Sequence, residues 1–307
     1  MDYIWLEEAL KSIKNQTDEN WMIIIVDDNS SDPMCREKLS SLRSIYGSKL
    51  KLIFLEQNQG PGNARNEGIR FAYQNRCPFV LFLDSDDFAP PNRLEITRRI
   101  FSKNKNAGVV YSTFEVIDEY GIKTEKDQIL PSILEIIQQH SDNPPQGKSV
   151  WRRIAIETGY VNLTSATSVR TELAYMYPFT NERVSEDFYT WLIYSASGWE
   201  FEYTGEVIVK YRIPRNTGSR TRDKLGGKHI FNMLKSIVDV RGFQYALDLA
   251  YENGEIENRD KKELMIEFCK KRAESMKLDN ENEIALDYYR RAYDLDAVFT
   301  KKIGFEI

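Results

Sequence analysis

The sequence predicts an α/β protein in which a mostly parallel sheet carries helices on both faces and is followed by a C-terminal helical extension. Short apolar segments of strand length alternate with amphipathic segments through the first part of the chain. Polar clusters directly follow two of these strands, and strand signals cease after about residue 215. Strands that alternate with helices favour parallel pairing, because each crossover helix covers one face of the sheet.

The first third of the chain shows this alternation most clearly. Leu6, Ala9, Leu10 and Ile13 have helical spacing, and the run that follows at 22–26 is entirely apolar. A turn-and-cap cluster at 27–33 then separates this strand from the next helical segment. The pattern predicts helices over 6–13, 35–46, 63–72 and 92–104, with strands over 22–26, 51–55, 79–83 and 109–117.

The alternation of strand and helix signals becomes less regular in the middle of the chain, and the end of the chain shows helical signals only. Residues 161–171 have strand character, 185–196 are typical of a helix, and 201–213 hold one or two strands. Long amphipathic stretches then cover 228–251, 260–276 and 281–293. We therefore expect an α/β domain over 1–215 and a helical extension over 216–307.

The composition argues against several classes of protein. The net charge of −5 arises from 42 basic and 47 acidic residues among 307, so no strong positive field points to nucleic acid. Cys35, Cys77 and Cys269 are too far apart to suggest a zinc ribbon or a disulfide framework. No apolar run is long enough to span a membrane, and the first residues lack a secretory signal pattern. We expect a cytoplasmic protein.

Two acidic clusters follow buried strands, at 27–28 and at 84–87. Ligands of α/β sheets bind outside the carboxyl ends of the strands, so these carboxylates are expected at the binding edge. Carboxylates that lie close together favour a hard cation such as Mg²⁺ or Mn²⁺, which also bridges phosphates. Two alternatives stay open: the acids cap the helices that follow, or they form the acidic pocket of a receiver-like signalling domain.

Several motifs follow one another in a fixed order along the chain, at 6–13, 15–17, 24–32, 58–60, 64–69, 82–87 and 185–188. Together they resemble the motifs of family 2 glycosyltransferases. That resemblance covers about residues 3–215 and implies a GT-A fold and an inverting transfer of sugar from a nucleotide-sugar donor.

The resemblance assigns roles to residues at the donor site. Asp28 matches the acid that holds the nucleobase, usually uracil, and Asp84 matches the acid beside the ribose. Asp86 matches the second acid of the Asp-x-Asp motif, which ligates Mn²⁺ or Mg²⁺ on the diphosphate. Arg65 resembles a basic residue near the donor, and an Arg that merely pairs with the surrounding acids is the alternative. We also consider the arginines at 212, 215, 220 and 222 as cations that neutralise the leaving diphosphate, or else as an exposed basic linker.

Asp187 matches the general base of the family. That base takes the proton from the acceptor hydroxyl as its oxygen attacks the anomeric carbon, and in-line attack inverts the anomeric configuration. The alternative is that Glu186 and Asp187 are first-turn acids favoured by the helix dipole, after an N-capping Ser185.

One departure from the family concerns the first strand. Members normally begin with a buried strand and a loop just before the helix that corresponds here to 6–13, whereas residues 1–5 offer no full strand. A central strand is therefore expected to be missing from the numbered chain. Either the natural N-terminus is longer, or another strand fills the gap, or donor binding is impaired; unfilled, the gap would leave strand edges unpaired.

These observations give an expected function. We expect a metal-dependent glycosyltransferase that uses a UDP-sugar in cell-surface polysaccharide or glycan synthesis. Its expected acceptor is a glycan or lipid-linked hydroxyl, reached at the inner face of the membrane without a transmembrane segment. Aromatic residues at 151, 160, 175 and 177 are candidates for stacking on sugar rings. The alternative is a nucleotide-sugar-binding module without turnover.

Overall fold

The computed structural model describes residues 3–215 and 220–305. The chain divides into two compact units, which are treated separately. Unit 1 comprises 1–146, 161–183 and 200–216, and unit 2 comprises 147–160, 184–199 and 217–307. The predicted boundary between 215 and 216 lies next to the last crossing between the units, but two earlier segments also belong with the C-terminal helices.

Unit 1 contains the strands and the helices that alternate with them. In chain order these are α1 (Tyr3–Lys14), β1 (Ile23–Asp27), α2 (Pro33–Ser41), α3 (Arg43–Tyr46), β2 (Leu50–Phe54), α4 (Pro61–Gln74), β3 (Phe79–Leu81), α5 (Arg93–Lys103), β4 (Ala107–Ile117), α6 (Pro131–Asp142), β5 (Thr167–Arg170), α8 (Thr171–Met176) and β6 (Glu200–Arg212). Every strand predicted from the apolar runs is present, with its ends moved by a few residues.

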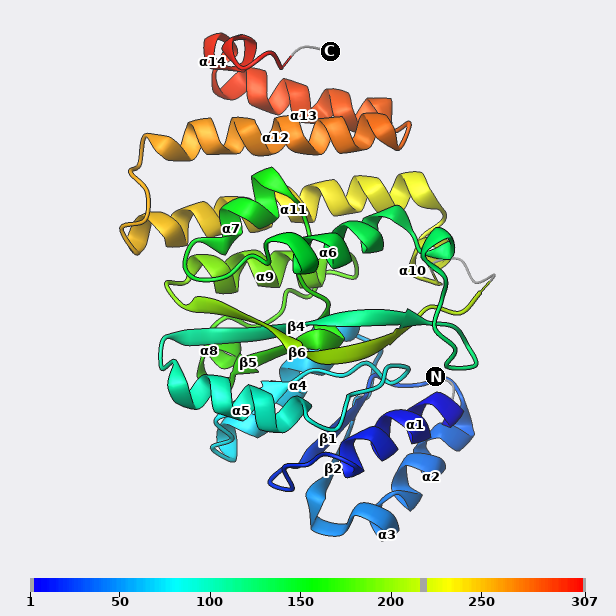
Figure 1. The fold of residues 1–307 in the computed structure, drawn as a ribbon. Helices are drawn as coiled ribbons and strands as arrows, with labels where there is room; N and C mark the ends of the chain where they lie inside the picture. Colours follow the sequence, from blue (N-terminus) through cyan, green and yellow to red (C-terminus); the bar gives the residue numbers. More distant parts are fainter. Residues whose placement is uncertain (1–2, 216–219, 306–307) are drawn as a thin grey trace. The chain divides into compact units, whose positions relative to one another are not determined.

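The strands form two sheets rather than one. β1 and β2 pair in parallel, and a second sheet has the order β3-β5-β4-β6. β4 and β6 are parallel and run side by side in Figure 1, whereas β5 is antiparallel to both β3 and β4. The expectation of mostly parallel pairing is thus met for two of the four pairings, because an apolar run reveals a strand but not its direction.

The first sheet is held by an apolar cluster that the sequence spacing explains. Leu6 and Leu10 project from one face of α1 and pack with Ile23 of β1, Leu39 of α2 and Leu52 of β2. All five side chains are buried. Burying an apolar side chain of this size contributes about 1.5–3 kcal/mol, so this cluster fixes α1 and α2 against β1 and β2.

Buried Arg93 ties the end of β3 to the neighbouring strand. Its Nη2 atom donates to the carbonyl oxygens of Phe82 at 2.8 Å and Thr167 at 3.1 Å. Burial lowers the pKa of Arg93 to about 10, so its guanidinium remains charged at neutral pH. This arginine therefore fixes the backbone just before the second acidic cluster.

Unit 2 is helical. It contains α7 (Val150–Arg152), a π-helical turn (Arg153–Glu157), α9 (Glu186–Ala196), α10 (Arg220–Lys224), α11 (Lys228–Glu252), α12 (Asp260–Leu278), α13 (Asn282–Leu295) and α14 (Ala297–Lys302). Figure 1 shows α12 against α13, with α11 next to α12. Phe243 of α11 stacks on Phe268 of α12 with ring centroids 4.6 Å apart. The predicted helical extension is therefore present, and α9 packs with it.

Candidate functional site

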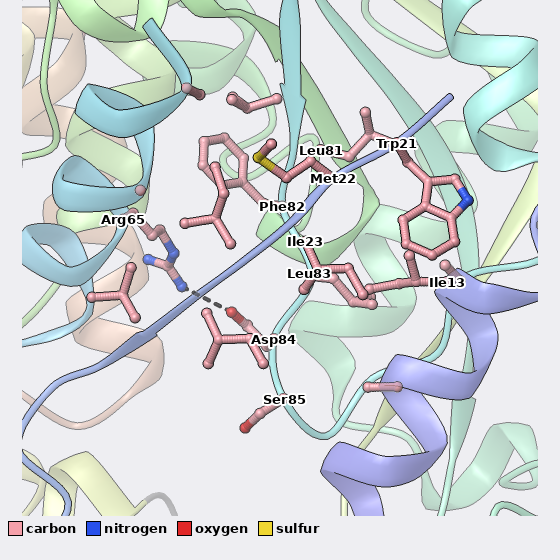
Figure 2. A pocket seen from close by; sticks show the side chains of 18 of the residues that line it. Ile13, Trp21, Met22, Ile23, Arg65, Leu81, Phe82, Leu83, Asp84 and Ser85 are labelled. Carbon is pink, nitrogen blue, oxygen red and sulfur yellow. Dashed lines mark hydrogen bonds and ion pairs between the residues drawn. The ribbon is translucent and has the colours of Figure 1, made fainter. Parts of the chain in front are cut away.

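A cavity separates the two sheets of unit 1. It has a volume of about 800 Å³ and is lined by α1, β1, α4, β3 and the residues that follow β3. Figure 2 shows side chains from the β1 segment, such as Met22 and Ile23, and side chains from the β3 segment, such as Leu81 and Leu83. Within the described chain, β1 pairs only with β2 and β3 only with β5. The cavity therefore lies between β1 and β3, two strands that do not pair with each other among the described residues.

Contacts at the two ends of the cavity show that β1 and β3 run in the same direction. At the end where both strands begin, Arg98 donates to the carbonyl oxygen of Asn20 at 2.9 Å and lies over the Phe79 ring. At the opposite end, both Asp28 after β1 and Asp84 after β3 line the cavity. The two acidic clusters therefore meet at one edge, as the sequence predicts.

Asp28 organises the loop that leads into α4. Its Oδ1 accepts from the Gln59 amide at 2.7 Å, and its Oδ2 accepts from the Gly60 amide at 2.7 Å. Gly60 has a φ of 91°, a left-handed conformation that glycine adopts without strain. Each oxygen of a carboxylate has two lone pairs, so Asp28 keeps the capacity to accept from a ligand.

Arg65 and Asp84 form an ion pair at the same edge. Arg65 extends from α4, and its Nη2 lies 3.1 Å from Oδ1 of Asp84, as the dashed line in Figure 2 shows. The Arg65 guanidinium also lies over the Phe179 ring, 5.4 Å from its centroid. The backbone amide of Asp84 donates to Ser165 Oγ at 2.9 Å. The two candidate donor-binding residues are thus together, with the Asp84 side chain 43% exposed.

Asp86 and Asp87 differ in their surroundings. Asp86 is partly exposed, whereas Asp87 is buried and accepts from the Arg212 amide at 2.8 Å through Oδ1. Oδ2 of Asp87 has no hydrogen-bond donor among the described residues. Burial, followed by the nearby charge of Asp84, raises the pKa of Asp87 well above its usual range. Carboxylates that lie close together, as here, favour a cation or a proton.

No ready-made metal cage exists in the described part of the chain, where no three His, Cys, Asp or Glu side chains converge on one point. The donor set still fits Mg²⁺ or Mn²⁺ carried by a substrate. Mg²⁺ usually keeps several waters and binds through one or two carboxylates together with substrate phosphates. A single partly exposed acid such as Asp86 meets that requirement.

The structure corrects the expectation that Arg212 belongs to an exposed basic linker. Arg212 ends β6 with only 3% of its side chain exposed, and its guanidinium bonds to the carbonyl oxygens of Asp86, Asp118 and Glu119. It also pairs with Glu8. Its donors are used inside the fold because the loops after β3 and β4 turn their carbonyl groups toward it.

Two other arginines of this segment contact residues of their own unit. Arg215 pairs with Asp118 at 2.9 Å in unit 1, while the Arg222 guanidinium lies over Phe231 in unit 2. The side chain of Arg220 lies outside the described part of the chain.

Asp187 lies in unit 2, in the first turn of α9. Its Oδ1 accepts from the Tyr160 hydroxyl at 3.2 Å and from the Phe188 amide at 2.7 Å. Ser185 occupies the N-cap position, but its side chain does not cap the helix as expected. Instead its hydroxyl donates to Asp239 of α11 at 2.5 Å.

The predicted sugar-stacking aromatic residues have other partners. Trp151 is fully buried and donates to Glu255 at 2.9 Å, and Tyr160 donates to Asp187. Tyr175 stacks on Tyr73 with ring centroids 3.9 Å apart. Sequence reasoning missed Lys235 and Asp239, whose i,i+4 spacing on a helix was the available signal.

The family follows from comparison with known proteins. A sequence profile described as glycosyl transferase family 2 matches residues 4–165, more than half of the chain. The chain belongs to glycosyl transferase family 2. The profile runs from within α1 to just before β5, includes both acidic clusters of this family 2 glycosyltransferase, and stops before Asp187.

Curated relatives of this glycosyltransferase share about a quarter of their residues with it. An uncharacterized glycosyltransferase of Methanocaldococcus jannaschii, MJ1057, is 25% identical over 76% of this chain and 74% of its own length. The Escherichia coli protein WfgD, a UDP-Glc:alpha-D-GlcNAc-diphosphoundecaprenol beta-1,3-glucosyltransferase, is 26% identical over 71% of this chain and 76% of its own. A putative teichuronic acid biosynthesis glycosyltransferase of Bacillus subtilis, TuaG, is 26% identical over 75% of this chain and 81% of its own.

Solved structures show the GT-A-like fold of this glycosyltransferase. Staphylococcus aureus TarS 1–349 in complex with UDP matches with a TM-score of 0.53 and 15% identity, over 98% of this chain and 88% of that one. The Pyrobaculum calidifontis mannosyltransferase PcManGT with GDP-Man and Mn²⁺ matches with a TM-score of 0.54 and 13% identity, over 99% and 76%. Among the helices that the structure describes, none is both long and apolar enough to cross a membrane.

Proposed function

We propose that this glycosyltransferase moves a hexose from a UDP-sugar to an acceptor hydroxyl with inversion of the anomeric configuration. One observation carries the proposal. Asp28, Arg65 and Asp84 line one end of the cavity, where β1 and β3 end. Nucleotides bind α/β sheets at this edge, and a mixed set of carboxylates and a guanidinium suits both a nucleoside and its diphosphate.

In this proposal, three acids each bind a different part of the donor. Asp28 accepts from the uracil N–H, and Asp84 accepts from the ribose hydroxyls. Asp86 would hold Mn²⁺ or Mg²⁺ that arrives with the diphosphate, and such a cation would supply positive charge for the leaving diphosphate. Arg65 positions Asp84 through their 3.1 Å contact and adds positive charge at the same edge.

Asp187 is the proposed base. A carboxylate can accept the proton of the acceptor hydroxyl late in the reaction, when the attacking oxygen has become acidic. Tyr160 and Phe188 both donate to its Oδ1. Of the described residues, none donates a hydrogen bond to Oδ2, so that oxygen is available for a proton.

The proposed acceptor is a glycan or lipid-linked hydroxyl in cell-surface polysaccharide synthesis. Support comes from the relatives, since WfgD bears the name of a glucosyltransferase acting on a diphosphoundecaprenol-linked sugar and TuaG that of a teichuronic acid enzyme. We place this reaction on the cytoplasmic side, at the inner face of the membrane, with no nucleic acid involved. A net charge of −5 argues against a nucleic-acid partner.

A second candidate is a nucleotide-sugar-binding module without turnover. The cavity between β1 and β3 favours it, because Asp28 lines a space between two strands that do not pair with each other among the described residues. Both candidates require donor binding, and only the first requires Asp187. Release of UDP from UDP-glucose by wild-type protein but not by Asp187→Asn would support the enzyme.

Donor binding is tested first by calorimetric titration of UDP and GDP, with and without Mn²⁺, on wild-type protein and on Asp86→Ala. We expect Mn²⁺-dependent UDP binding that weakens by at least roughly 10- to 100-fold in Asp86→Ala, because loss of a residue that only supports a metal ligand already costs that much and Asp86 is the proposed ligand itself. Asp127→Ala removes an exposed acid of unit 1 and serves as the matched control. Equal UDP affinity in wild type and Asp86→Ala would refute the metal role of Asp86.

A further inference from the structure

A polar cluster in unit 2 joins the turn that carries Asp187 to the C-terminal helices. We infer that Ser185, Lys235 and Asp239 are positioning residues for Asp187: they hold the left-handed turn that begins α9, while Tyr160 holds one oxygen of the Asp187 carboxylate. This inference deepens the proposed function and rests on the role of Asp187 as the base. It gives α11 a part in catalysis.

The turn itself needs support. Ser185 has φ 57° and ψ 20°, in the left-handed region that residues with a Cβ atom rarely adopt. Such a conformation persists where surrounding contacts enforce it. The Ser185 hydroxyl supplies one contact, because it donates to Asp239 Oδ1 at 2.5 Å rather than to the start of α9. Asp187 follows two residues later, so the direction of its side chain depends on this turn.

Lys235 closes the cluster. Its Nζ donates to Asp239 Oδ2 at 2.7 Å and to Ser185 Oγ at 3.1 Å. The Asp239 side chain is only 2% exposed, and a buried carboxylate is stable only with cations and hydrogen-bond donors around it. Arg272 of α12 adds a second positive charge 3.8 Å from Asp239 Oδ2. Ser185 Oγ therefore accepts from one helix residue and donates to another, which fixes its position.

Tyr160 orients the carboxylate. Its hydroxyl and the Phe188 amide both donate to Oδ1 of Asp187, at 3.2 and 2.7 Å. Burial, and then the charges of Asp187 and Asp239, raise the pKa of Tyr160 well above its usual value, so the phenol stays a donor. One oxygen of Asp187 is thereby held and the other is left for the acceptor proton.

The kinetic test compares Asp239→Asn with Asp248→Asn. Asp248 lies on the same helix and pairs with Lys261 at the surface, so its substitution is a matched charge change away from the cluster. Release of UDP from UDP-glucose in Mn²⁺, with water or an added hexose supplying the hydroxyl that takes the glucosyl group, gives kcat, and calorimetry gives the UDP affinity. We expect Asp239→Asn to lower kcat roughly 10- to 100-fold at unchanged UDP affinity, because small misplacements of a catalytic group have effects of that size. Wild-type kcat in Asp239→Asn would overturn the inference.

The second test compares Ser185→Ala with Ser185→Gly. Both lack the hydroxyl, but only glycine adopts the left-handed conformation without strain. If the hydroxyl secures the turn, Ser185→Gly unfolds at lower urea concentration than wild type, because the contacts of the hydroxyl with Asp239 and Lys235 are lost. Ser185→Ala unfolds at a lower concentration still, because its Cβ atom also strains the left-handed turn. A midpoint of Ser185→Gly equal to or above that of wild type would overturn the inference, since the hydroxyl would then not secure the turn.

The two tests separate the inference from the function on which it rests. The urea midpoints need no substrate and decide whether the cluster holds the turn, even where UDP-glucose is not consumed. Full activity of Asp187→Asn would refute the role of Asp187 as the base, and the stability comparison of the Ser185 variants would still be interpretable. Loss of activity in Asp187→Asn together with normal activity in Asp239→Asn would keep the base and reject the positioning cluster.

Discussion

The two histidines of the chain have opposite electrostatic surroundings. His140 is buried in unit 1, where its Nε2 lies 2.7 Å from the Val161 carbonyl oxygen and burial lowers its pKa. His229 is exposed in unit 2, and its Nδ1 lies 2.7 Å from Glu281 Oε2. The hydrogen bond to Glu281 raises the pKa of His229. Protonation therefore strengthens the link between α11 and the residue that precedes α13.

This pairing predicts a pH-dependent contribution to stability. A raised pKa in the folded state means that the contribution is fully present below the unfolded value of about 6.5 and is lost as pH rises through the folded pKa. We expect wild-type protein to exceed His229→Gln in urea midpoint at pH 5.5 and to match it at pH 9. Lys228→Gln, which breaks the neighbouring Lys228–Asp279 pair, should have no such pH profile. A difference that is constant from pH 5.5 to 9 would contradict the pairing.

The sequence predicted where a site residue lies when that residue directly follows a strand. Asp28 and Asp84 meet at one edge because each follows a strand, and that rule is visible in the residue pattern. The contacts of Tyr160 with Asp187 and of Ser185 with Asp239 span 27 and 54 residues of sequence. No local periodicity encodes such pairs, so the cluster around Asp187 required the fold. The assigned roles of the site residues remain predictions.

At the scale of elements, two helical glycines predict opposite effects of the same substitution. A Cβ atom on Gly242 of α11 would lie 2.8 Å from Cδ2 of Tyr189, so α11 approaches α9 too closely for any larger residue. A Cβ atom on Gly68 of α4 would meet Val26 at 3.6 Å, an ordinary contact on the cavity wall.

Substitution with alanine tests this difference. We expect Gly68→Ala to stabilise the protein by about 0.5–1 kcal/mol, because alanine favours the helix and nothing obstructs its methyl group. Gly242→Ala gains the same helical preference but should lose about 1–2 kcal/mol overall through overpacking against Tyr189. Urea unfolding of both variants measures whether each substitution raises or lowers the free energy of unfolding. A stabilised Gly242→Ala would mean that α9 and α11 have room to separate.

Most elements were predictable because their apolar spacing is regular. α1, α4 and α11 to α13 all follow from helical periodicity, and β1 through β4 follow from short apolar runs. α2 and α3 divide at Leu42, where the sequence predicted one continuous helix. α6 was not predicted, although Pro131 stands at its first turn. The direction of β5 could not be predicted from the sequence, because strand direction depends on long-range pairing. β5 is antiparallel to both of its neighbours, whereas parallel pairing was expected.

At the scale of the whole molecule, the chain crosses between its units several times. Segments 147–160 and 184–199 belong to unit 2, although they precede the predicted boundary at 215 and 216. The second of them carries α9, whose Phe188, Trp191 and Leu192 are buried. Since α9 packs with α11, the C-terminal helices are part of one core rather than an appendage.

Removing those helices should therefore disrupt the rest of unit 2. We expect a fragment of residues 1–215 to aggregate or to unfold without a cooperative transition, because the apolar face of α9 loses its cover. Co-expression of 216–307 with this fragment should restore a soluble complex, which separates loss of packing from damage by the chain break. Size-exclusion chromatography and circular dichroism distinguish these outcomes. A monomeric fragment 1–215 with a sharp melting transition would show that the extension is dispensable for folding.

The cavity between β1 and β3 also determines how the molecule responds to compression. The cavity of about 800 Å³ is space that the folded chain does not fill and that is lost when unit 1 unfolds. Hydrostatic pressure favours whichever state is smaller, and unfolding typically reduces volume by about 20–100 mL/mol, in proportion to such voids. A cavity of this size is therefore expected to make the volume change of unfolding unit 1 more negative, which unfolding under hydrostatic pressure would measure.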